Sequence, residues 1–403
     1  MPALSSSSIS TFLLIFLLAL RASICTGKPT IRTPLPRQLT VDYYAKTCPQ
    51  LEQLVGSVTS QQFKEAPVSG PATIRLFFHD CFVEGCDASI LISTKPGGKE
   101  LAEKDAVDNK DLRVEGFQTI SKAKASVESK CPGVVSCADI LAIAARDYVH
   151  LAGGPYYQVK KGRWDGKISM AARVPYNIPS ANFTIDQLLK LFNSKGLTLE
   201  DLVVLSGAHT FGFAHCKQFV SRLYNYRGTK QPDPAMDTRL LKALRMSCPQ
   251  FGGNSDIIAP FDVATPFLFD HAYYGNLEAK LGLLASDQAL FLDPRTKPLV
   301  QQLAKDKQKF FQAFSIAMEK MGSIGVKRGR RHGEKRTDLS SKSCEGREFG
   351  GERRREKRRL SSRLEERMAL AGGKDSREGN SIIMTTMTEK KPKNHRIQSI
   401  FAR

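Results

Sequence analysis

The chain of 403 residues is long enough to bury a large core, and this length is typical of two or three domains or of one large helical domain. Its formal net charge of +20 is unevenly spread, because residues 327–403 hold 23 Lys or Arg against 11 Asp or Glu. Beyond the first 25 residues no apolar run approaches the roughly 20 residues of a membrane span, which excludes a membrane-embedded fold.

The N-terminus carries a stretch that predicts secretion. Residues 11–20 are almost wholly apolar but too few to cross a bilayer, and small residues such as Ala22 and Gly27 follow them. We therefore expect a signal peptide over residues 1–25. Residues 26–37 hold three prolines and no hydrophobic period, which is typical of an extended arm.

The nine cysteines favour disulfides. Removal of Cys25 with the signal peptide leaves eight, an even number of the kind found in secreted, disulfide-bonded chains. A zinc site is the alternative, but Cys81 and Cys86 lie five residues apart without a matching second pair. The sequon at Asn182 predicts a glycosylated surface loop.

Apolar residues recur at helical spacing along most of the chain, which predicts a mainly α fold with few strands. The helical patterns fall within residues 41–63, 71–81, 114–127, 134–151, 185–192, 199–209, 219–224, 240–246, 272–280 and 297–321. Short β-prone pieces and turns occupy residues 156–179. From residue 327 the apolar period ends, which predicts a solvated, disordered tail or, as the alternative, a segment that binds polyanions.

The run from Pro71 to Cys81 carries an unusual polar pair. As a helix it places Arg75 and His79 one turn apart on the same face, with Phe78 beside them. Such a pair can take a proton from one end of a small molecule while the guanidinium stabilises charge at the other end. The alternative is a core helix whose histidine is only hydrogen-bonded.

A second histidine, His209, follows Gly207 and Ala208 and falls on the buried stripe of its predicted helix. The small residues leave room for a large flat group such as haem. Two histidines on separate helices fit a haem that is held by one imidazole and open on its other face. A metal-bound imidazole usually donates its second N–H to a carboxylate, which the spacing alone does not identify. A satisfied core histidine is the alternative.

Two groups of oxygen-bearing side chains offer the ligands that calcium prefers. The first group is Asp80, Asp87 and Ser89, and the second is Thr210, Asp262, Thr265 and Asp270. The alternative is that they are ordinary turn and cap residues.

The stretch 75–89, which reads R-L-F-F-H-D-C-F-V-E-G-C-D-A-S, resembles the secretory plant (class III) haem peroxidases. The motifs at residues 103–106, 135–139, 205–212 and 286–288 share this resemblance. It implies the haem peroxidase fold over residues 38–338, with two helical lobes, a haem between them and few short strands. Residues 339–403 have no family counterpart and form the basic tail.

The resemblance also implies site residues and cofactors, which are haem b and two calcium ions. The catalytic residues would be His79, Arg75, Phe78, Asn109 and Glu103. The iron ligand would be His209, with Asp287 as its carboxylate partner, and Pro179 would line the donor site. The distal calcium would bind Asp80, Val83, Gly85, Asp87 and Ser89, and the proximal calcium would bind Thr210, Asp262, Thr265, Leu268 and Asp270.

The family pattern implies three disulfides, which join Cys48 with Cys131, Cys81 with Cys86 and Cys216 with Cys248. A fourth would use Cys137, but the chain has Leu339 where the family has its cysteine. Cys344 is the remaining candidate partner for Cys137.

The implied activity is reduction of hydrogen peroxide with one-electron oxidation of small phenolic donors. His79 would move the proton from one peroxide oxygen to the other, and Arg75 would stabilise charge as the O–O bond breaks. The alternative function is a catalytically weak wall-binding protein of the same fold, whose basic surface holds acidic polysaccharide. We expect a secreted monomer in the cell wall or apoplast, with the vacuole as the alternative, and the signal peptide argues against a nucleic acid or membrane partner.

Overall fold

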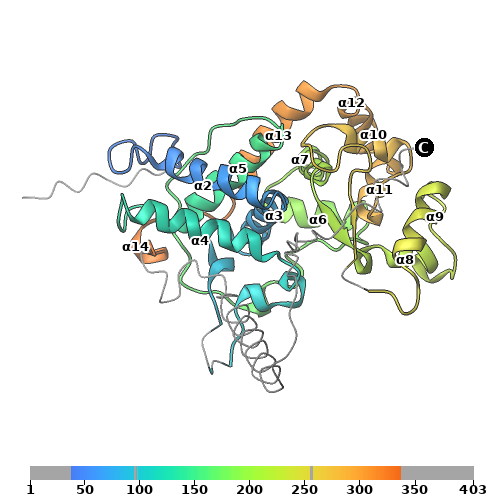
Figure 1. The fold of residues 1–403 in the computed structure, drawn as a ribbon, viewed down its shortest axis with the longest axis horizontal. Helices are drawn as coiled ribbons and strands as arrows, with labels where there is room; N and C mark the ends of the chain where they lie inside the picture. Colours follow the sequence, from blue (N-terminus) through green and yellow to red (C-terminus); the bar gives the residue numbers. More distant parts are fainter. Residues whose placement is uncertain (1–37, 95–96, 98, 255–256, 337–403) are drawn as a thin grey trace, which may run out of the picture. The chain divides into compact units, whose positions relative to one another are not determined.

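The computed structural model describes residues 38–94, 97, 99–254 and 257–336, and this part of the chain is mainly helical, as predicted (Figure 1). The expected signal peptide, extended arm and basic tail lie outside the described residues. Within them, no helix is both long and apolar enough to cross a membrane.

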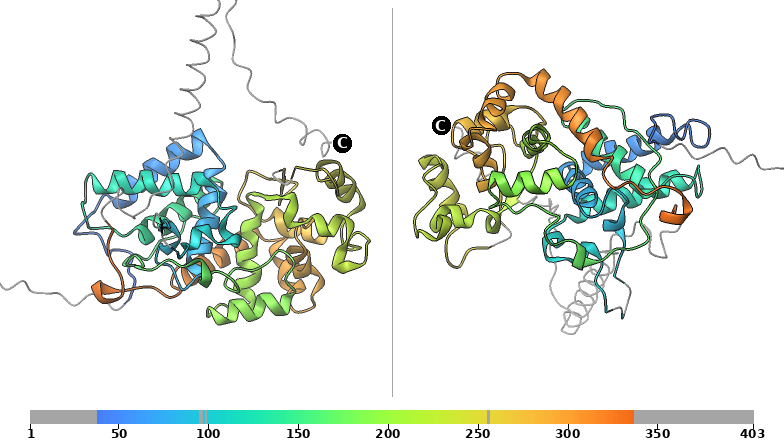
Figure 2. Two further views of the ribbon diagram at one scale, coloured as in Figure 1. Left: turned by 90° about the horizontal axis from the view of Figure 1, so that it is seen from below. Right: turned by 180° about the vertical axis from the view of Figure 1, so that it is seen from behind.

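A first group of helices packs together in the N-terminal half (Figures 1 and 2). Its members are α2 (Leu51–Glu65), α3 (Ser69–Phe82), α4 (Val114–Glu128) and α5 (Cys137–Leu151). Helix α5 is buried along nearly its whole length because it is rich in alanine, as its sequence predicts. Ser136 caps it by accepting the Asp139 backbone N–H at 3.2 Å. The disulfide Cys48–Cys131 joins the entry of α2 to the end of α4.

The loop from α3 to α4 is built of short 3₁₀ turns rather than strands. They are η1 (Ser89–Leu91), η2 (Glu103–Asp105) and η3 (Val107–Asn109). The disulfide Cys81–Cys86 closes the loop just after α3, so these two cysteines do not form the alternative zinc site.

A second group of helices follows in the C-terminal half (Figure 1). It contains α6 (Ile185–Ser194), α7 (Leu199–Ser206), α8 (Val220–Tyr224), α9 (Thr238–Ser247), α10 (Ala272–Glu278), α11 (Ala285–Leu292) and α12 (Lys297–Leu303). Further 3₁₀ turns are η4 (Ala171–Arg173), η5 (Gly207–Thr210), η6 (Cys216–Gln218) and η7 (Tyr226–Gly228). Strands β1 (Phe213–His215) and β2 (Ile258–Pro260) pair antiparallel, with Ala214 opposite Ala259. The disulfide Cys216–Cys248 joins the end of β1 to α9.

Helices α13 (Lys307–Met321) and α14 (Gly329–His332) complete the described fold, and α13 packs against α7 and α12. The pattern over residues 297–321 predicts one helix, but the structure has two. The chain breaks because Asp306 has an extended backbone and caps α13, accepting the Lys309 backbone N–H at 2.9 Å. Helix α11 was not predicted because three of the residues that it buries, Ser286, Asp287 and Gln288, are polar, so it shows no apolar stripe. Strands β1 and β2 have three residues each, too few to show a period.

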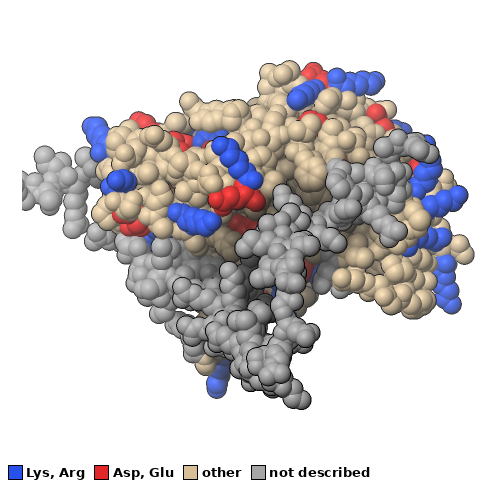
Figure 3. Space-filling model, in the orientation of Figure 1, with Lys and Arg blue, Asp and Glu red and all other residues tan. Residues whose placement is uncertain are grey.

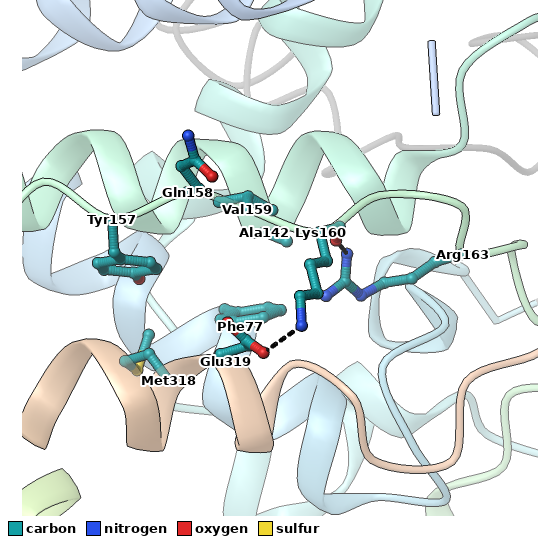
Figure 4. A pocket seen from close by; sticks show the side chains of 9 residues that line it. All are labelled: Phe77, Ala142, Tyr157, Gln158, Val159, Lys160, Arg163, Met318 and Glu319. Atoms are coloured by element: carbon teal, nitrogen blue, oxygen red, sulfur yellow. Dashed lines mark hydrogen bonds and ion pairs between the residues drawn. The ribbon is translucent and has the colours of Figure 1, made fainter. Parts of the chain in front are cut away.

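Helix α3 packs against α5, and on its face away from His79 Phe77 lies near Met318 and Glu319 of α13 (Figure 4). Phe77 is buried there, beside a cavity of about 10 Å³ that has room for at most one water. Lys160 pairs with Glu319 at 2.6 Å, and the Arg163 Nε donates to the Gly322 carbonyl at 2.9 Å. These contacts join the segment that follows α5 to the end of α13.

The last described residues tie the C-terminal end to the first helical group. Arg336 is buried, and its Nη1 donates to the Ala88 carbonyl at 3.1 Å. Its backbone N–H donates to Asp165, whose carboxylate also accepts the Cys137 N–H at 3.1 Å. Cys137 is disulfide-bonded, but Cys344 lies outside the described residues, so their pairing stays a prediction.

Candidate active site

Helix α3 carries three of the candidate residues. Arg75, Phe78 and His79 lie within one turn of each other, as the sequence predicts. Arg75 Nη1 donates to the Asp111 carbonyl at 3.1 Å, and the Phe78 ring meets the His79 ring edge to face at 5.5 Å. His79 is only 3% exposed.

A chain of hydrogen bonds runs from His79 through the loop between α3 and α4. His79 Nδ1 lies 2.7 Å from Asn109 Oδ1, and Asn109 Nδ2 donates to the Glu103 carbonyl at 2.7 Å. The Ser89 hydroxyl in turn donates to Glu103 Oε2 at 3.0 Å. Because the Glu103 carbonyl fixes the orientation of the Asn109 amide, the oxygen faces the ring and His79 Nδ1 is the donor. The Nε2 atom of His79 therefore carries the lone pair.

The surroundings of His79 keep its imidazole neutral. Burial lowers the pKa of His79 to about 3, and repulsion from the Arg75 guanidinium acts in the same direction, while the hydrogen bond to Asn109 opposes both. His79 is thus a proton acceptor across the ordinary pH range.

The second histidine has a charged partner. His209 Nδ1 lies 2.9 Å from Asp287 Oδ1, and the Tyr273 hydroxyl donates to the same oxygen at 2.9 Å. The His209 ring stacks on Phe261, with ring centres 4.2 Å apart and planes 3° apart. With Nδ1 bonded to a carboxylate, the Nε2 lone pair is left for a metal.

The exposure of His209 differs from the prediction. Its side chain is 37% exposed, whereas the sequence placed it on the buried stripe of a helix over residues 199–209. The reason is that α7 ends at Ser206, and His209 lies in the following 3₁₀ turn, which rotates it away from the buried face. Its accessible Nε2 and its flat aromatic neighbour fit a haem ligand.

The segments that carry the two histidines adjoin. A Cβ at Gly70, in the first turn of α3, would lie 2.8 Å from the ring of Phe211, and one at Gly212 would lie 3.1 Å from Pro71. Asp111 joins the same two regions, because its carbonyl binds Arg75 and its carboxylate pairs with Lys217 at 2.7 Å.

Three buried carboxylates gather at the candidate distal calcium site. Burial raises the pKa of Asp80 and of Asp87, and it raises that of Glu103 to about 9, with the other two carboxylates adding to the effect. Asp80 Oδ2 accepts the Ala88 N–H at 2.9 Å. A cation here would offset this repulsion, so the residues fit a hard metal ion.

The backbone oxygens expected at this site come from Val83 and Gly85. Val83 is fully buried at the end of α3. Gly85 has φ of +118°, and a Cβ there would lie 2.5 Å from Gly325 Cα, so only glycine fits.

The candidate proximal calcium residues also lie together. The Thr210 hydroxyl donates to Asp262 at 3.0 Å and lies 3.3 Å from Asp270, while the Thr265 hydroxyl lies 3.2 Å from Asp270. The Leu268 side chain is 53% exposed, so this residue can contribute only its backbone oxygen. Across the described parts of the chain, no three His, Cys, Asp or Glu side chains form a metal cluster. A calcium ion at either candidate site would therefore need hydroxyl and backbone oxygens in addition to the carboxylates.

Pro179 lies part-buried in the loop before α6, and no described contact links it to either histidine. Sequence reasoning missed three residues of the site: Asp111, Phe261 and Tyr273. Their partners lie 14 to 52 residues away in the sequence, so no helical or strand spacing could have indicated these contacts.

Comparisons with known proteins show the family to which the chain belongs. The family model described as Peroxidase matches residues 55–306. The chain is 66% identical over 338 residues to Peroxidase 19 of Arabidopsis thaliana, which covers 83% of this chain and 97% of the relative. It is 47% identical over 304 residues to Peroxidase 55 of the same plant, covering 75% of this chain and 90% of the relative.

A mainly helical fold with one buried and one carboxylate-bound histidine is consistent with a haem-dependent class of enzyme. The chain belongs to the peroxidase family, among the class III plant peroxidases. It is therefore a peroxidase, which uses hydrogen peroxide and an electron donor, and the family implies haem. The alternative of a catalytically weak wall-binding protein gains no support from these relatives.

Proposed function

We propose that this peroxidase holds haem b through His209 and oxidises small phenolic donors in one-electron steps. The observation that carries the proposal is the pair of Nδ1 hydrogen bonds, from His79 to neutral Asn109 and from His209 to the Asp287 carboxylate. Haem would supply the redox chemistry. Both histidines form a hydrogen bond through Nδ1, but one partner is neutral and the other is charged. This difference suits His79 to proton transfer and His209 to metal binding.

His79 acts on the proton of the peroxide. Its Nε2 lone pair accepts a proton from one oxygen of hydrogen peroxide and returns it to the other oxygen, which leaves as the O–O bond breaks. Asn109 holds the ring in the tautomer that makes this transfer repeatable. Arg75, one turn away, stabilises the charge on the leaving oxygen, and loss of a preorganised group of this kind costs about 10²–10³ in rate.

His209 serves as the metal ligand. The Asp287 carboxylate is itself oriented by Tyr273 and accepts a hydrogen bond from the Nδ1–H of His209. This bond makes Nε2 a stronger electron-pair donor to iron. The two calcium ions would bind the oxygen groups described above, one beside each histidine. Phe78 would wall the haem pocket, and Pro179 would line the donor site.

We further propose that the protein is secreted as a monomer and that its excess of Lys and Arg binds acidic wall polysaccharide. The apolar stretch over residues 11–20 and the even number of remaining cysteines support secretion. The space-filling view supports the second point, because Lys and Arg stand out over the part that carries α8 and α9 (Figure 3).

The test is the purified, haem-reconstituted protein. We expect a haem Soret band and peroxide-dependent oxidation of guaiacol, and the Arg75→Leu protein should keep the band while losing about 10²–10³ in rate. A protein that takes up haem but oxidises no phenol would overturn the donor assignment.

A further inference from the structure

A cavity of about 290 Å³ lies in the second helical group, apart from both histidines. Its apolar wall consists of Phe183, Tyr226, Ala285 and Ala289. The two alanines lie two residues to either side of Asp287 on α11, so they occupy the helix face opposite to the one that meets His209. The cavity is therefore backed by α11 and is not part of the peroxide site.

Its polar rim comes from a tightly held turn after α8. Arg227 (φ +50°) and Lys230 (φ +59°) both have left-handed backbones, which are unfavourable for these residue types. The turn persists because the Tyr226 N–H donates to the Gln231 carbonyl at 2.8 Å and the Thr229 hydroxyl donates to the Tyr226 carbonyl at 2.7 Å. Strain that is kept in place by such bonds is typical of ligand sites.

The strained turn contributes the arginine side chain of Arg227 to the cavity lining. Arg227 lines it, and its guanidinium lies 5.1 Å from the centre of the Tyr226 ring. Among the described residues, none forms an ion pair with Arg227. The nearest acidic residues in the sequence are engaged elsewhere, since Asp233 pairs with Arg222 at 2.8 Å and Asp237 caps α9.

The positive charge around this cavity extends over its neighbourhood. Lys230 and Lys242 are exposed, and Arg245 lies 5.0 Å from the Tyr224 ring. Figure 3 shows Lys and Arg side chains gathered over the part of the molecule that carries α8 and α9. An anion that approaches this side is attracted toward the cavity.

The size and lining of the cavity select the ligand. An apolar cavity of about 150 Å³ holds one benzene molecule, so about 290 Å³ admits one aromatic ring with a short side chain. Phe183, Tyr226 and the alanine methyls suit the ring, while Arg227 suits a carboxylate and Asn225 supplies an amide hydrogen bond.

We propose that this cavity binds a small aromatic carboxylate at a site separate from the peroxide chemistry. An acidic sugar has the same charge but polar edges all round, which the apolar wall would leave without partners. The proposal does not rest on the donor assignment above, because it concerns binding alone.

The test measures binding of trans-cinnamate, which has the ring and the carboxylate but no phenol to be oxidised. Isothermal titration calorimetry is done on the haem-loaded protein from a bacterial host, so that Asn182 carries no glycan. We expect saturable binding, and binding at least tenfold weaker for Arg227→Asn, since asparagine tolerates the left-handed backbone. The matched control is Arg239→Asn, an exposed arginine on α9 outside the cavity lining, which should bind cinnamate as the parent does.

A second variant tests the cavity without changing charge. Ala289→Leu fills the space and should also weaken binding at least tenfold. Equal cinnamate binding by the parent, Arg227→Asn and Ala289→Leu proteins would overturn the proposal, as would equal affinity of the parent for galacturonate or for cinnamyl alcohol. Guaiacol oxidation should stay unchanged in both variants, so failure here leaves the proposed function intact and is distinguishable from its failure.

Discussion

The two histidine environments use the same ring in opposite ways. His79 is buried, donates from Nδ1 to the neutral amide of Asn109 and has a guanidinium on its own helix. His209 is partly exposed and donates from Nδ1 to the carboxylate of Asp287. A neutral acceptor leaves a modest base that releases its proton again, whereas a carboxylate makes a strong ligand. The charge of one hydrogen-bond partner therefore separates proton transfer from metal binding.

Removal of the His79 imidazole should have the largest effect. We expect His79→Ala to lower the rate of the peroxide reaction by about 10²–10⁴ while haem stays bound, because general acid–base catalysis contributes about that much. Stopped-flow kinetics with hydrogen peroxide measure it. His150→Ala is the control, since His150 is exposed on α5. If both variants react at the parent rate, His79 is not the base.

The Asp287 carboxylate offers the next largest effect. Asp287→Asn should weaken haem binding by about 10–100-fold, as is usual when the partner of a metal-bound histidine is changed. Competitive haem transfer gives the affinity, and Asp186→Asn on α6 is a matched control whose carboxylate is 80% exposed. Asn109→Asp should by contrast leave haem affinity unchanged and alter only the peroxide step. Equal haem affinities of the parent and Asp287→Asn proteins would remove the distinction between the two environments.

Removal of calcium tests the two candidate calcium sites, one beside each histidine. Chelation should lower the melting temperature and added calcium should restore it, because a ligand present at 100 times its dissociation constant stabilises the fold by about 2.7 kcal/mol. Calorimetry with and without chelator measures this. Magnesium is the control ion, since its strict octahedral demand suits these oxygen groups poorly. A melting temperature that does not depend on calcium would contradict both calcium sites.

The smallest expected effect is on the free energy of unfolding at acid pH, and it concerns Asp201. Asp201 caps α7, the helix that leads to His209, by accepting the Thr198 N–H at 2.9 Å, and it also accepts from Lys320 at 2.9 Å. Although burial opposes it, these bonds lower the pKa of Asp201, so its stabilisation is present above its unfolded pKa and is lost as the pH falls through the folded value. Asp201→Asn should cost about 1 kcal/mol at neutral pH, and this cost should disappear as the pH falls below the folded pKa of Asp201.

Chemical denaturation at several pH values measures this difference. The control is Asp306→Asn, which removes the charge of the α13 cap but leaves α7 and the Lys320 contact unchanged. A cost for Asp201→Asn that does not vary with pH would contradict the assignment.

The sequence predicted the parts of the site that are fixed by short spacing. Arg75 and His79 are four residues apart, so the helical repeat alone puts them on one face. Asp287 came only from the family resemblance, because it lies 78 residues from His209 on a helix whose buried face is largely polar. Asp111 and Tyr273 remained hidden because tertiary packing alone brings them to the site. The break before α13 and the end of α7 at Ser206 were missed because a local cap and a 3₁₀ turn override an apolar repeat.

The central claim is that His209 binds iron and His79 does not. Haem titration of the His209→Ala and His79→Ala proteins, followed by the Soret band, tests it most directly. We expect one haem bound per chain by the His79→Ala protein and no stoichiometric binding by the His209→Ala protein until imidazole is added. Tight haem binding by the His209→Ala protein without imidazole, or loss of haem from the His79→Ala protein alone, would contradict the account.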